Sequence, residues 1–113
     1  MTTVKDVLAF LDSKAPLTTQ LGFDNAGFLC GDAAAEVRRV LVALDITDGV
    51  IAEAAGFGAE LIVSHHPVCF TPMKSVTTDD LTGRKFAAML RGGISAICMH
   101  TNLDAAPGGV NDA

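Results

Sequence analysis

Residues 61–67 read Leu-Ile-Val-Ser-His-His-Pro and decide both the fold class and the place to look for chemistry. Three apolar residues in a row, two of them β-branched, are typical of a short strand that is covered on both faces. The strand pattern ends by delivering His65 and His66 side by side to its tip. Ligand sites of open α/β sheets lie at such strand tips, so this segment predicts a site at the edge of a sheet.

Two further apolar runs have the same form. Val40–Leu44 also predicts a strand covered on both faces and ends at Asp45, and Ile94–Met99 ends at His100. Capping residues, helical spacing and glycine stops between the runs predict a helix from residue 47 to about residue 55 and another over residues 81–91. Strand, helix, strand, helix, strand is the pattern of crossover connections in a parallel sheet.

The chain before residue 40 adds two elements. Apolar residues at helical spacing predict an amino-terminal helix over Val4–Lys14, and Phe28–Cys30 predicts a short additional strand that forms a hairpin with the strand at Val40–Leu44. The predicted fold class is therefore α/β, with a mainly parallel sheet from β-α-β-α-β crossovers.

Size and composition limit the function classes. A chain of 113 residues, 50% hydrophobic, forms one domain over 1–113, yet no apolar run reaches the roughly 18 residues of a membrane span. The net charge of −5 without a basic patch argues against nucleic-acid binding. Three cysteines without CxxC spacing and the absence of a signal-peptide pattern favour the reducing cytoplasm.

The last residues, Pro107–Ala113, read as a turn that feeds a new helix, with Asn111 or Asp112 suited to cap it. We therefore expect the domain to be the amino-terminal part of a longer protein. A naturally ragged tail is the alternative.

Parallel strands point their carboxyl ends the same way, so Asp45, the histidine pair and the segment His100–Asp104 are expected along one edge. Imidazole and carboxylate are ligands of borderline divalent cations such as zinc, iron, manganese and nickel, and this set predicts a metal centre. Because neighbours at a strand tip point to opposite sides, the rings of His65 and His66 are expected to diverge and to hold two ions, one each.

The other members of the cluster have open roles. Asp104 is expected to bind or bridge the ions, whereas His100 is a ligand, an acid or base, or a residue that orients Asp104. Asp45 either orients a ligand or caps the following helix.

Three residues nearby are weaker candidates. Asp24 and Asn25 either reach the site or form a turn. Cys69 is disfavoured as a ligand, because a single thiol in this setting is more often a small buried hydrophobe.

Together, four motifs in this order resemble the Nif-three-like family, the dinuclear-metal proteins often named GTP cyclohydrolase 1 type 2. They are Phe23–Phe28, Val42–Thr47, Ser64–Pro67, and His100–Asp104 with Gly109–Asp112. The resemblance implies an α/β fold, homohexamers of the full-length protein, and two divalent metal ions per subunit. It also implies His65, His66 and Asp104 as the metal ligands and a nucleotide as the substrate.

This sequence departs from the family pattern in two ways. Phe23 stands where the family usually has Trp, and nothing here corresponds to the carboxy-terminal part of the family, which supplies a further His and Glu. The chain would then carry part of a site, so we expect it to bind metal weakly or incompletely and to be inactive alone.

The function predicted from the sequence is a metal-dependent hydrolase resembling GTP cyclohydrolase 1 type 2, in which a dinuclear site activates water. The alternative is a non-catalytic metal-binding assembly or regulatory protein, since a fold and a ligand set do not establish turnover.

Overall fold

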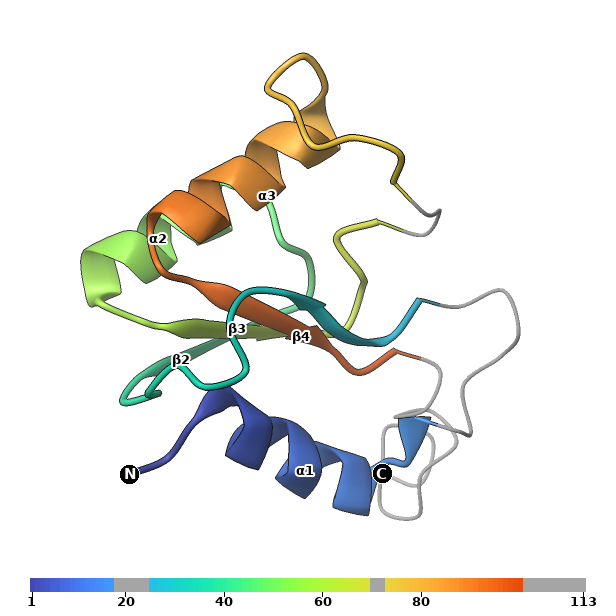
Figure 1. Cartoon of the computed structure of the whole chain (residues 1–113), viewed down its shortest axis with the longest axis vertical. Helices are drawn as coiled ribbons and strands as arrows, with labels where there is room; N and C mark the ends of the chain where they lie inside the picture. The colour runs from blue at the N-terminus through green and yellow to red at the C-terminus, as the bar shows by residue number, and fades with distance from the viewer. Residues whose placement is uncertain (18–24, 70–72, 101–113) are drawn as a thin grey trace.

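The computed structural model describes residues 1–17, 25–69 and 73–100, which form three layers (Figure 1). Their elements, in chain order, are α1 (Val4–Lys14), β1 (Gly27–Cys30), β2 (Val40–Ala43), α2 (Asp48–Phe57), β3 (Leu61–Ser64), α3 (Leu81–Arg91) and β4 (Ser95–Cys98). The strands form one sheet in the order β1-β4-β3-β2. β2, β3 and β4 are parallel, which confirms the predicted fold class.

The helices begin and end where their capping residues lie. Thr3 and Asp6 form a capping box at the start of α1, and the side chains of Thr47 and Asp80 cap α2 and α3. Gly58 ends α2 with a φ of 78°, a left-handed conformation that glycine adopts without strain. No helix in the described ranges is long and apolar enough to cross a membrane.

The two middle strands are covered on both faces. On one face, α2 and α3 bury residues of both helices and of the sheet: Ile51, Ala54, Phe86, Met89, Ile62 and Ala96. On the other face α1 packs over Leu61, Ile97 and Met99 (Figure 1). Because β3 and β4 are held from both sides, their carboxyl ends are fixed relative to each other.

The predicted hairpin between Phe28–Cys30 and the following strand is wrong. β1 pairs antiparallel with β4, with Gly27 opposite Cys98, and lies at the far edge of the sheet from β2. The connection over residues 31–39 is too long for a tight hairpin turn and is instead tied to the start of α1. There the carbonyls of Ala33 and Ala35 accept hydrogen bonds from backbone N–H groups of α1.

The prediction that Val40–Leu44 is covered on both faces is also wrong. The side chain of Val42 is 75% exposed, and Val40 and Leu44 are exposed as well. β2 is an edge strand, and α1 packs over β3 and β4 without reaching it. An apolar run of this kind indicates a strand, but its place in the sheet decides how many faces are covered.

Candidate metal centre

The tips of β3 and β4 bring the three histidines of the chain together. Ring centroids lie 5.2 Å apart for His65 and His66, 4.9 Å for His65 and His100, and 5.4 Å for His66 and His100. One nitrogen from each ring lies within 4.8 Å of the other two, and all three residues are half-buried. The predicted convergence at one sheet edge is therefore present for these side chains.

Backbone hydrogen bonds continue the β2–β3 pairing past the strand ends and hold the histidine pair. The N–H of His65 donates to the Ala43 carbonyl at 3.3 Å, and the N–H of His66 donates to the Leu44 carbonyl at 2.9 Å. The imidazoles are thus attached to a fixed backbone rather than to an open loop.

The rings of His65 and His66 do not diverge as predicted, because both approach the ring of His100. The regular strand ends at Ser64, and the Ser64 hydroxyl donates to the carbonyl of His66 at 2.8 Å in a local bend. The alternation of side chains applies only within an extended strand. The ring positions therefore do not favour one ion per ring, and the expectation of two ions rests on the family resemblance.

His65 is oriented by the backbone of the neighbouring strand. Its Nδ1 lies 3.0 Å from the carbonyl oxygen of Met99. A carbonyl only accepts, so Nδ1 carries the proton and Nε2 is the nitrogen able to bind a cation. The thiol of Cys98 also donates to the His65 carbonyl, at 3.3 Å. This ring is therefore held by main-chain atoms that no substitution removes directly.

His66 is oriented by a side chain. Its Nδ1 lies 2.6 Å from Oδ1 of Asp45, the residue that follows β2 by two positions. The carboxylate accepts a hydrogen bond from Nδ1–H and so directs Nε2 of this ring to cation binding, an arrangement common around metal-ligating histidines. Of the two roles considered for Asp45, the contact matches orientation of a ligand, since Thr47 alone supplies the side-chain cap of α2.

The remaining candidates have different outcomes. Asp104 and Asp24 lie outside the described residues, so their roles stay predictions. Asn25 donates its side-chain amide to the carbonyl of Cys69 at 2.9 Å. Cys69 is not grouped with the histidines, and burial raises the pKa of its thiol, which favours the neutral form over the thiolate that a metal requires.

Reasoning from the sequence missed two contributors. The Met99 carbonyl has no signal in the sequence, because any residue at that position offers the same atom. Ser64 had a weak signal, since a hydroxyl at the last position of a buried strand is well placed to cap the turn that follows.

The donor set fits a divalent cation. Three imidazoles offer nitrogen ligands from one small volume, and two of them have their second nitrogen engaged by an acceptor, as is usual for metal-ligating histidines. Both orienting partners of His65 and His66 accept a hydrogen bond from the ring, and neither brings a competing positive charge into the cluster.

The chain is similar to several known proteins in sequence and in structure. A "GTP cyclohydrolase 1 type 2 homolog" of Clostridium perfringens is 40% identical over 109 residues, which cover 96% of this chain and 42% of that relative. Two crystal structures superpose closely. That of a Staphylococcus aureus protein has a TM-score of 0.91 at 39% identity and is matched over 97% of this chain and 31% of its own. That of a Bacillus cereus protein related to NIF3 has a TM-score of 0.90 at 35% identity, over 98% of this chain and 30% of its own.

The chain thus spans less than half the length of the relatives it matches. The family pattern of Duf34/NIF3 (NGG1p interacting factor 3) matches residues 2–113, which is nearly the whole sequence. On this match and on the shared fold, the chain belongs to the Duf34/NIF3 family.

Proposed function

We propose that His65, His66 and His100 bind a divalent cation and that the whole protein is a metal-dependent hydrolase. The observation that carries this proposal is the cluster of three imidazole nitrogens within 4.8 Å, with the two rings of the histidine pair oriented through Nδ1. Asp104 is the further ligand that the family resemblance implies. Zinc, iron, manganese and nickel all suit this donor set.

When bound, a divalent cation lowers the pKa of a coordinated water toward neutrality and polarises the oxygen of a substrate. The chain's own residues prepare this chemistry. Met99 and Asp45 keep the protons of His65 and His66 on Nδ1, so that neither ring must reorganise when it binds a cation. His100 is placed either to complete the ligand set or to move a proton at its edge.

The name of the Clostridium perfringens relative makes GTP the first substrate to test, with water attacking the purine imidazole carbon. The same activated water would serve phosphoester or amide hydrolysis. We propose further that the whole protein holds two ions per subunit and forms a homohexamer, as the family resemblance implies, and that it acts in the cytoplasm, as the cysteine pattern favours. The isolated chain, which carries part of this site, should be inactive.

The test is product release from GTP and from a panel of phosphoesters by the metal-loaded whole protein. His65→Ala and Asp104→Ala should each abolish turnover while circular dichroism stays unchanged. Asp79→Ala, which removes an exposed carboxylate from the segment before α3, is the matched control and should keep full activity. Metal-dependent assembly without turnover on any of these substrates would instead favour the non-catalytic alternative.

A further inference from the structure

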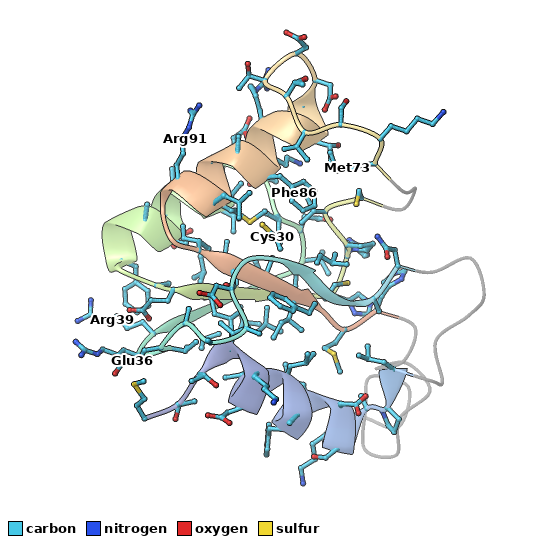
Figure 2. All side chains as sticks on the ribbon, viewed as in Figure 1. Cys30, Glu36, Arg39, Met73, Phe86 and Arg91 are labelled. Carbon is cyan, nitrogen blue, oxygen red and sulfur yellow. The ribbon has the colours of Figure 1, made fainter. Side chains whose placement is uncertain are left out.

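A second feature of the same sheet is a pocket of about 490 Å³ between β1, α3 and the segment that follows β3. Phe86 and Cys30 lie between α3 and the sheet, with Met73 toward the loop side (Figure 2). Val76 and Leu90 complete the rim, where they are 52% and 56% exposed. A volume of this size is ordinary for a small-molecule site.

The residues that the structure describes along the wall of this pocket carry no charged side chain. Its described lining residues are apolar apart from the Asn25 amide, the Cys30 and Cys69 thiols and the backbone. Burial raises the pKa of Cys30 to about 11 and also raises that of Cys69, so both thiols are neutral at pH 7. A charged group would lose its hydration in this pocket without a partner, whereas an uncharged ring would gain apolar contact.

One end of the pocket lies at the sheet edge that carries the histidines. β1 runs antiparallel to β4, so Asn25, just before β1, lies at the carboxyl end of β4, where His100 follows. Asn25 is hydrogen-bonded to Cys69, which follows His66 by three residues. Three residues reach at most about 11 Å, so the Cα atoms of Cys69, on the pocket wall, and His66, in the cluster, lie no farther apart than that.

We propose that this pocket holds an uncharged ring of the substrate while the bond to be hydrolysed reaches the histidine cluster. The proposal rests on the proposed function and narrows it, because it assigns the substrate two parts, a neutral planar group and a group that meets the cation. A nucleobase and a plain aryl group share this chemistry. The two differ in how many hydrogen-bonding groups they carry, and the described pocket wall offers few partners for such groups.

The pocket is tested in the metal-free chain with phenylnaphthylamine, a neutral dye whose fluorescence rises in apolar surroundings. We expect saturable binding of one dye, weakened about ten-fold by Leu90→Asp and by Val76→Asp, because each places a carboxylate at the apolar rim. Leu81→Asp is the matched control on α3, since Leu81 is 50% exposed and does not line this pocket. Its dye affinity should stay within about two-fold of the wild type.

The same protein is used to test where the dye binds and which class of ligand competes with it. Bound dye should slow alkylation of Cys69 by N-ethylmaleimide, measured by peptide mass spectrometry. Naphthol should displace the dye at least about ten-fold better than naphthoate, which has the same rings with a negative charge. Guanosine competing as well as naphthol would assign the ring to a nucleobase, and weaker competition would assign it to an aryl group.

The proposal is overturned if both rim variants bind dye like the wild type, if Leu81→Asp weakens binding equally, or if naphthoate competes as well as naphthol. His65→Ala separates this outcome from failure of the proposed function. That variant should lower zinc affinity roughly a hundred-fold or more and leave dye binding unchanged, so each idea can fail without the other.

Discussion

The two ends of the β2–β3 pair use carboxylates in opposite ways. At the amino-terminal end, Oε1 of Glu60 accepts the backbone N–H groups of Arg38 and Arg39 at 2.8 and 3.0 Å. At the carboxyl end, Asp45 accepts from the ring of His66 at 2.6 Å. The Glu60 carboxylate is used to hold the backbone at Arg38 and Arg39 beside the start of β3. The Asp45 carboxylate orients a side chain that still has a nitrogen for a cation, so only the carboxyl end is arranged for a ligand.

Removing an imidazole should have the largest effect on zinc affinity. His65→Ala deletes a nitrogen of the cluster, and we expect the affinity for zinc to fall roughly a hundred-fold or more, beyond the effect of losing an orienting partner. Isothermal titration calorimetry on the chain and the variant measures this. Zinc binding that is unchanged in His65→Ala would show that the cation is held elsewhere.

The orienting carboxylate should have the next largest effect. Asp45→Ala leaves His66 without its Nδ1 partner, and the zinc affinity should fall about 10- to 100-fold. Asp45→Asn keeps an oxygen that can accept the same hydrogen bond, so its loss of zinc affinity should be smaller. If Asp45→Asn loses as much zinc affinity as Asp45→Ala, the charge rather than the hydrogen bond is what matters at this position.

The opposite end should respond in stability and not in metal binding. Glu60→Ala leaves the N–H groups of Arg38 and Arg39 without their carboxylate acceptor, so the thermal unfolding midpoint should fall. Zinc affinity should stay within about two-fold of the wild type, because the histidines lie at the other end of the strands. A parallel loss of zinc affinity would mean that the two ends are coupled.

The smallest effect concerns pH. Hydrogen bonds from the backbone of Arg39 and Arg38 lower the pKa of Glu60 below its ordinary value of 4.5. A lowered pKa in the folded state adds stability above pH 4.5 that is lost as pH falls through the folded-state value. The difference in urea midpoint between the wild type and Glu60→Gln should therefore be constant above about pH 5.5 and shrink below pH 4.5. A difference that grows in acid would contradict this sign.

Much of the fold could be predicted because its signals are local. Thr3, Thr47 and Gly58 mark helix ends by their own chemistry, and the apolar runs before Asp45 and His100 indicate strands wherever they lie. The parallel order then follows from the helices between them. Convergence of the imidazoles was predictable for the same reason.

What could not be predicted depends on contacts between distant residues. The pairing of β1 with β4 and the exposure of Val42 are set by strand order, which no single run encodes. The convergence of His65 and His66 depends on a bend after Ser64, and the alternation rule fails there. The choice between two roles for Asp45 required its distance to the imidazole of His66.

We infer that the imidazoles at the ends of β3 and β4 bind one cation jointly. Anomalous diffraction at the zinc absorption edge, on crystals of the protein grown with zinc, tests it directly. We expect an anomalous peak about 2.0 to 2.1 Å from Nε2 of both His65 and His66, with His100 beside it. A peak bonded to other residues, or no peak at the histidines in zinc-saturated crystals, would contradict it.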